Sequence, residues 1–157
     1  SRAGGGVLLY AKIELHAVSY SMKSDFPEQV WCCFLDANRN GCFVGVCYRT
    51  PSVDIFGSPN HDKLADIIND LGTTKKHFLL MGDFNYRFTS WPPHNADSAV
   101  SREASDFCNL LDDYYFTQHV QVPTRLDAIL DLVITDEPEM VSTWLISVGS
   151  RAATTMH

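Results

Sequence analysis

Long hydrophobic runs, paired cysteines and concentrations of basic charge are all scarce in this sequence of 157 residues. No apolar stretch approaches the ~20 residues that a membrane-spanning helix needs. The opening residues, "SRAGGGVLLYAK", contain too short an apolar run for a secretion signal. We therefore expect an intracellular protein that is neither secreted nor held in a membrane, and the length suits one domain.

The cysteines lack the spacing of a zinc knuckle, because no two of them have a two-residue gap. Their number is odd, and four of them lie in apolar, strand-like runs, which argues against a disulfide framework. We predict that they are buried thiols in a reducing compartment. The five cysteines are Cys32, Cys33, Cys42, Cys47 and Cys108.

Basic residues are few, since 12 lysines and arginines stand against 19 aspartates and glutamates, giving a net charge of −7. They are also scattered, and Lys75-Lys76 is the only adjacent pair. Proteins held to nucleic acid by phosphate contacts usually carry a basic face. Broad, salt-driven affinity for DNA is therefore not predicted from this chain alone.

The sequence does contain clear strand and helix patterns. Apolar residues recur at helical spacing in 61–72 and 101–115, where Asn60 would cap the first helix and Gly72 would end it. The apolar run 77–84 is typical of a central strand. Further strands are expected at 6–13, 29–37, 42–50 and 128–135, with "NRNG" joining the second and third as a hairpin. This order predicts an α/β fold in which helices cover a mixed sheet.

Asp83 and Asn85 follow the apolar strand in "HFLLMGDFNYR". Side chains two apart on an extended chain point to the same face, so this pair would project together from one strand end. A simple turn is the competing interpretation, because Gly-Asp and Asn are common turn formers. A site is favoured by the setting, since open α/β sheets bind ligands beyond their strand ends. The carboxylate could bind a divalent cation or accept a proton from water, and the amide could donate to a phosphoryl oxygen.

Two further groups could serve the same chemistry. Tyr48 and Arg49 close a strand in "VCYRTPS", and both side chains can donate to phosphate. The alternative is an edge tyrosine packed on the sheet beside a solvated arginine. Asp131 lies within the apolar run "ILDLVIT", where a carboxylate must be partnered or neutral. It could pair with a core arginine or orient a catalytic histidine.

Five ordered blocks resemble the endonuclease/exonuclease/phosphatase superfamily: "GGGVLLY", "GVCYRTPS", "LLMGDFNYR", "VQVPTR" and "ILDLVIT". They look most like the endonuclease domains of non-LTR retrotransposons, which precede a reverse transcriptase. The resemblance implies a four-layer α/β sandwich and a DNA-nicking activity that hydrolyses phosphodiesters with Mg²⁺ or Mn²⁺. DNA would be the partner, a reverse transcriptase domain would lie in the full-length parent, and a functional protein would act in the nucleus.

The resemblance also implies roles for individual residues. Asp83 would bind the metal and help to deprotonate the attacking water, while Asn85 would steady the phosphate or that water. Tyr48 would contact the scissile phosphate, and Asp131 would hold a catalytic histidine in the right tautomer. The substrate-binding residues would be Arg49, Thr124 and Arg125, with Thr124 at a position that often contacts DNA in the retroelement branch.

The chain also departs from the superfamily pattern. A strand bearing asparagine and one ending in a metal-binding glutamate would precede "GGGV", and an Asp-His pair would follow the last strand. We therefore expect residues 1–141 to form a partial domain, truncated at both ends, with weak metal binding and no activity as a fragment. Reading the codons of "AATTMH" one base earlier permits Gly-Asn-Asp-His-Ala, so we hypothesise that the atypical tail 142–157 is frameshifted.

Two other functions stay open on the sequence. One is a phosphatase of the same superfamily acting on inositol phosphates or sphingomyelin, which the acidic charge favours mildly. The other is a non-catalytic interaction module that keeps the sandwich without the chemistry.

Overall fold

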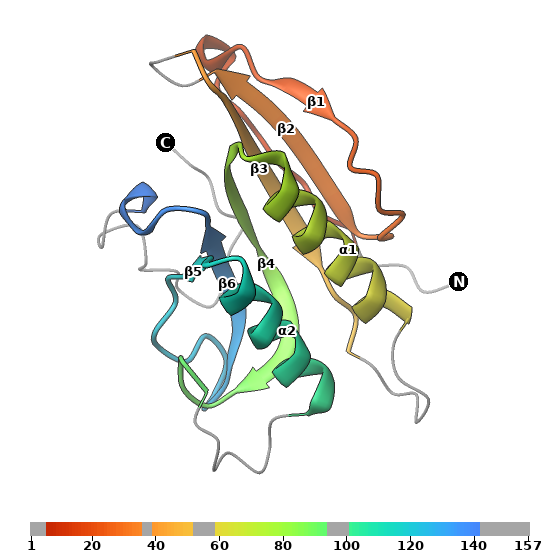
Figure 1. Ribbon diagram of the computed structural model, residues 1–157, viewed down its shortest axis with the longest axis vertical. Coiled ribbons are helices and arrows are strands. Elements are labelled where there is room, and N and C mark those ends of the chain that lie inside the picture. The colour runs from red at the N-terminus through yellow and green to blue at the C-terminus, as the bar shows by residue number, and fades with distance from the viewer. Residues whose placement is uncertain (1–5, 36–38, 52–58, 94–100, 142–157) are drawn as a thin grey trace.

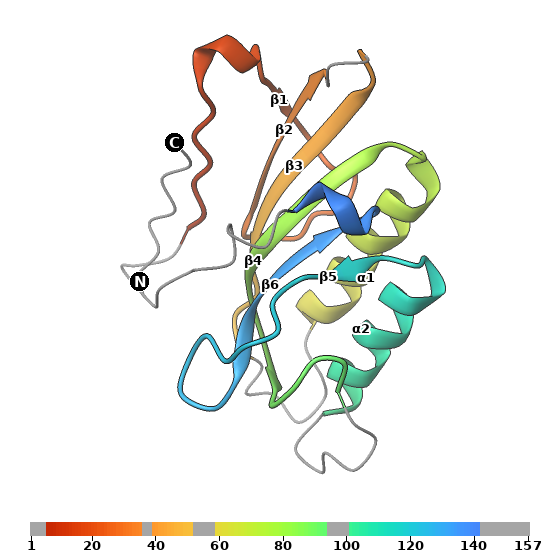
Figure 2. The same cartoon turned by 90° about the vertical axis from the view of Figure 1, so that its left-hand side faces the viewer.

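The fold is a six-stranded mixed sheet with both α-helices of the described region on one face, as a computed structural model shows (Figures 1 and 2). The structure describes residues 6–35, 39–51, 59–93 and 101–141. The expected tail at 142–157 lies outside these ranges. No helix in the described ranges is long and apolar enough to cross a membrane.

The strands follow the order β1-β2-β3-β4-β6-β5 across the sheet, and only the β3–β4 pair is parallel. The central strand β4 lies between β3 and β6, as its wholly apolar first half predicts. Their bounds are β1 Val18–Tyr20, β2 Gln29–Leu35, β3 Gly41–Tyr48, β4 His77–Phe88, β5 Thr117–Gln118 and β6 Ile129–Thr135.

Helices α1 (Pro59–Thr74) and α2 (Arg102–Asp113) bury the apolar faces that their periodicity predicts. Ser101 caps α2, since its side chain accepts a hydrogen bond from the Ala104 backbone at 3.2 Å. The buried positions are Leu64, Ile67, Ile68 and Leu71 on α1, and Ala104, Phe107, Cys108 and Leu111 on α2. The core of the protein therefore lies between these helices and one face of the sheet.

Two expectations about α1 are wrong. The helix begins before Asn60, and it continues through Gly72 to Thr74. A Cβ atom at Gly72 would lie 2.3 Å from the ring of Tyr114, the residue that follows α2. Gly72 is therefore a point of close packing between the two helices and does not end α1.

The strand expected at 6–13 is also absent. This segment is irregular as far as the short 3₁₀ helix η1 (Ile13–Leu15), and Figure 2 shows it on the side of the sheet away from the helices. Leu8, Tyr10 and Ile13 are 68%, 78% and 85% exposed, so burial does not drive strand formation there. The first strand is instead the short β1.

All five cysteines carry free thiols. Cys42, Cys47 and Cys108 are buried, as predicted, and burial raises the pKa of the Cys47 thiol to about 12. Cys32 and Cys33 are only half-buried, because they lie near the β1 edge of the sheet. The prediction of buried thiols therefore holds for three of the five.

Candidate active site

Three of the predicted site residues form one row across neighbouring strands. Tyr48 on β3 pairs in register with Asp83 on β4, and Asp83 pairs with Asp131 on β6. Adjacent strands lie about 4.8 Å apart, so the three residues are direct lateral neighbours. We call Tyr48, Asp83 and Asp131 the polar row.

The polar row projects from the face of the sheet that the helices leave uncovered. Side chains alternate between faces along a strand, and the flanking residues Cys47, Phe84 and Leu132 all belong to the core beneath the helices. Each member of the row is therefore directed to the other face. The row also lies where β3 ends and where its parallel pairing with β4 stops, although β4 itself continues to Phe88, and α/β sheets bind ligands beyond such strand ends.

Gly82 permits the close approach of β3 and β4 just before the row. Its φ is +151°, and a Cβ atom there would lie only 1.8 Å from the Cys47 carbonyl oxygen. The backbone N–H of Arg49 donates to the Asp83 carbonyl oxygen at 2.9 Å. A glycine at this position thus fixes the spacing between Tyr48 and Asp83.

Asp83 lies in an environment that disfavours its charge. Burial raises the pKa of its carboxyl group above the ordinary value, and the neighbouring Asp131 carboxylate raises it further. The backbone N–H of Asn85, which donates to Asp83 Oδ1 at 3.1 Å, and the positive charge of Arg125 partly oppose this rise in pKa. A cation beside the two carboxylates would relieve the remaining repulsion.

Asn85 lies next to Asp83 on an irregular part of β4. Its φ is +52°, and the pairing of β4 with β6 shifts register between Asp83 and Phe88. Its side-chain Nδ2 donates to the Arg49 carbonyl oxygen at 2.7 Å. The Asn85 amide therefore holds the end of β3, and a side-chain hydrogen bond from Asn85 to Asp83 also opposes the rise in the Asp83 pKa.

Thr124 and Arg125 approach the row from the turn before β6. The Thr124 hydroxyl oxygen accepts hydrogen bonds from the backbone of Leu130 at 3.1 Å and Asp131 at 3.2 Å. It therefore positions the Asp131 backbone while keeping its own hydrogen to donate. Arg125 is exposed, and it is close enough to Asp83 for its charge to lower the Asp83 pKa.

Arg49 is not part of this group, so the expected substrate contact has no support in its position. Its side chain is only 3% exposed, and its guanidinium forms an ion pair with Glu103 on α2. It also lies 4.2 Å from the ring centre of Tyr86 on β4. Arg49 follows Tyr48 directly, so strand alternation directs it to the helix side of the sheet.

Glu103 is the important residue that the sequence analysis missed. It lies in the first turn of α2, and its carboxylate neutralises Arg49 beneath that helix. Strand alternation could have indicated it, because alternation directs Arg49 to the helix side of the sheet. A buried arginine there needs an acidic partner. Among the described residues, the buried arginine pairs with Glu103 and not with Asp131, so the core-arginine alternative for Asp131 stays a prediction.

The described histidines with bonded side chains are engaged away from Asp131. His61 Nδ1 lies 2.7 Å from the Tyr86 hydroxyl. His119 Nε2 lies 2.8 Å from the Thr135 hydroxyl. Burial lowers the pKa of His119. His77 bonds to Asp136. The expected pairing of Asp131 with a catalytic histidine therefore stays a prediction.

Comparison with protein families gives one finding. Residues 42–150, more than half of the chain, match a family model described as endonuclease-reverse transcriptase. The match includes the polar row and four of the five sequence blocks quoted above, whereas "GGGVLLY" precedes it. No curated protein matches the chain.

Proposed function

The chain belongs to the endonuclease-reverse transcriptase family of the endonuclease/exonuclease/phosphatase superfamily, retrotransposon type, and we propose that it hydrolyses DNA phosphodiesters at the polar row. Membership supports an endonuclease-type nuclease domain. We propose in addition that the domain nicks DNA and that the reaction depends on Mg²⁺ or Mn²⁺.

The observation that carries the proposal is the register of Tyr48, Asp83 and Asp131 on three adjacent strands. Two carboxylates and a phenol side by side form a site with both acceptors and a donor. Burial and Asp131 raise the Asp83 pKa, which is typical of a carboxylate arranged for a function and not for stability alone.

Each residue of the site has a role that its position supports. Asp83 aligns the attacking water and helps to deprotonate it. The Tyr48 hydroxyl donates to a phosphoryl oxygen, and the Asn85 amide, which is hydrogen-bonded to Asp83, helps to steady the attacking water. The exposed Arg125 guanidinium binds the DNA backbone beside the row, and Thr124 keeps Asp131 in place.

The carboxylates of Asp83 and Asp131 suit a hard divalent cation. Mg²⁺ and Mn²⁺ prefer oxygen ligands, and one or two protein carboxylates with several waters are usual for Mg²⁺. Asp83 would be the principal ligand in this proposal. The ion would neutralise charge on the phosphate, and we expect weak binding because both protein ligands are single carboxylates.

A second sheet packed on the uncovered face would complete the four-layer sandwich of the superfamily. Val46, Met81 and Val133 form a lateral row on that face, next to the polar row, and all three are half-buried. An apolar strip beside a polar edge is the pattern expected where two sheets meet. We propose this packing for a longer parent protein, called the retroelement protein below. In that protein the domain would also adjoin a reverse transcriptase, and the whole protein would act in the nucleus.

We further propose that this chain by itself nicks DNA far more slowly than the retroelement protein. Within the described ranges, no hydrogen bond joins a histidine to Asp131. A general acid for the leaving group would then be lacking, and such a group typically contributes about 10²–10⁴ in rate.

The test is relaxation of supercoiled plasmid by the retroelement protein and by this chain, each with Mg²⁺ or Mn²⁺. Asp83→Asn and Asp131→Asn should abolish nicking in the longer protein. Asp127→Asn is the matched control, because Asp127 is an exposed acid outside the polar row. Its carboxylate lies 3.6 Å from the Arg87 guanidinium. Full nicking by Asp83→Asn would refute the proposal. Release of phosphate from inositol polyphosphates without nicking would instead indicate the phosphatase alternative.

A further inference from the structure

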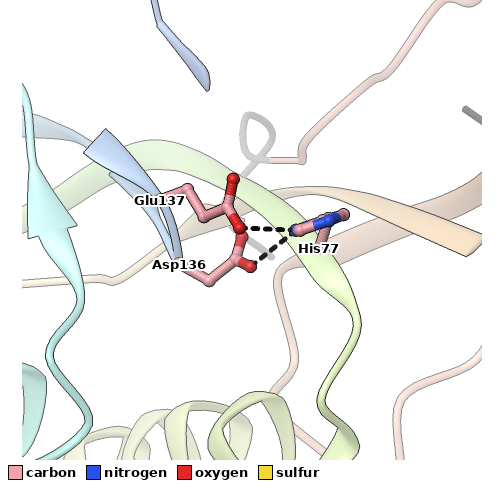
Figure 3. Close-up of side chains that lie close together, drawn as sticks. All are labelled: His77, Asp136 and Glu137. Carbon is pink, nitrogen blue, oxygen red and sulfur yellow. Dashed lines mark hydrogen bonds and ion pairs between the residues drawn. The ribbon is translucent and has the colours of Figure 1, made fainter. Parts of the chain in front are cut away.

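A second group of ligand-type side chains lies at the start of β4 (Figure 3). His77 begins β4, and Asp136 and Glu137 directly follow β6. The antiparallel pairing of β4 with β6 brings these two strand ends together. Asp83 lies six residues along β4 from His77, about 20 Å away at 3.3 Å per residue. The group is therefore separate from the polar row.

The spacing within this group suits a small tetrahedral ion. His77 Nδ1 lies 2.8 Å from Asp136 Oδ2 and 3.8 Å from Glu137 Oε1, and the three ligand atoms all lie within 4.8 Å of one another. Zinc bonds of about 2.0–2.2 Å in a tetrahedron place ligand atoms about 3.3 Å apart. The observed distances lie on either side of that value, so small side-chain rotations would complete the geometry.

Hydrogen bonds already orient the acidic members of the group. Asp136 Oδ1 accepts from the Phe78 backbone N–H at 3.0 Å, which leaves Oδ2 directed at His77. The Thr135 hydroxyl donates to the Glu137 carbonyl oxygen at 2.6 Å and holds the backbone at this turn. Outer hydrogen bonds of this kind position the ligands of metal sites.

Among the described residues, no lysine or arginine forms an ion pair with Asp136 or Glu137. In the part of the chain that the structure describes, the ion pairs of Asp136 and Glu137 are with His77. With a neutral imidazole the group carries a charge of −2. His77 and Asp136 are 36% and 22% exposed and Glu137 is 56% exposed, so an ion can enter from solvent.

We propose that His77, Asp136 and Glu137 bind a divalent transition-metal ion of the zinc type. An imidazole nitrogen suits Zn²⁺, whereas Mg²⁺ prefers oxygen ligands alone. Water would take the fourth position. The bound ion would link the start of β4 to the end of β6 and stabilise their pairing, independently of the chemistry proposed at the polar row.

Zinc affinity of the purified, metal-stripped chain tests the proposal, measured by competition with a chromogenic chelator. Glu137→Gln should weaken binding at this site by about tenfold or more, because it removes a charged ligand. Glu139→Gln is the matched control, since Glu139 is exposed on the following turn η2 (Pro138–Met140) and is outside the group. Any zinc held by the five free thiols would be the same in both variants, so their comparison removes that contribution.

Cobalt and thermal unfolding give independent readouts. Co²⁺ should show the visible absorption of a tetrahedral nitrogen-oxygen site in the wild-type chain, and His77→Gln should lose it. Zn²⁺ should raise the unfolding temperature of the wild type and of Glu139→Gln but not of Glu137→Gln, and excess Mg²⁺ should not compete. Equal zinc affinity and equal thermal shifts in the two glutamate variants would overturn the proposal and leave a simple His–Asp hydrogen bond.

Discussion

Asp83 and Asp131 lie directly opposite each other in the antiparallel pair formed by β4 and β6. Like charges at such positions destabilise a sheet, yet the pair lies on the central strand, directly before the register shift between β4 and β6. The arrangement is costly for folding and useful for holding a cation.

Replacing Asp83 with asparagine should stabilise the chain at neutral pH. Burial and Asp131 raise the Asp83 pKa, so the folded state binds more protons than the unfolded state, and stability falls as pH rises from the unfolded pKa of about 3.9 through the raised folded value. Asparagine keeps an acceptor for the Asn85 N–H and removes the charge. Urea unfolding should show a gain of about 0.2–1 kcal/mol at pH 7 and a smaller gain at pH 3.

The control for this effect is Asp127→Asn, because the Asp127 side chain is 81% exposed and its stability contribution is small. A loss of stability in Asp83→Asn at pH 7, or a gain that does not depend on pH, would contradict the electrostatic account.

Gly82→Ala should destabilise the chain severely. The φ of +151° strains any L side chain, and the added Cβ would collide with the Cys47 carbonyl oxygen. We expect a loss of about 3 kcal/mol or more in the free energy of unfolding. Gly41→Ala is the matched control, since its Cβ would meet no atom closer than 3.6 Å, and circular dichroism in urea compares the two. Similar stability of the two variants would show that the close approach of β3 and β4 is not required.

Glu103→Gln should destabilise the chain more than the double variant Arg49→Met/Glu103→Leu. The single change leaves a guanidinium that is 3% exposed without its acidic partner, which typically costs about 3–5 kcal/mol. The double change removes both charges and keeps the volume close. A double-mutant cycle of unfolding free energies, completed with the single variants Arg49→Met and Glu103→Leu, measures the coupling. Additive effects would mean that the ion pair contributes little.

Tyr48→Phe should leave stability nearly unchanged and reduce nicking by the retroelement protein. Tyr48 is half-buried, and the ring keeps its packing when the hydroxyl is removed. Loss of one donor to the transition state typically costs about 10²-fold in kcat. Plasmid nicking rates and unfolding curves separate the two effects. A stability loss that fully accounts for the fall in activity would argue for a structural tyrosine.

Much of the fold was predictable because its signals are local. The helical period of Leu64, Ile67 and Leu71 marks the buried face of α1, and the apolar run into Gly82 marks the central strand. The failures have tertiary causes. Gly72 matches a helix-ending signal, yet it packs against Tyr114, which directly follows the other helix. The apolar segment around Tyr10 pairs with no strand of the described sheet.

One part of the candidate site was also predictable from local signals, and another part depended on the tertiary structure. Residue types and alternation along single strands determined by themselves that Tyr48 and Asp83 are suited to phosphate chemistry, and they could have directed Arg49 to the helices. Only the tertiary structure decided that Asp131 lies opposite Asp83 and that His77 meets Asp136. Strand order and register depend on pairings between distant segments, where burial of whole faces selects one alignment, and no local pattern encodes that choice.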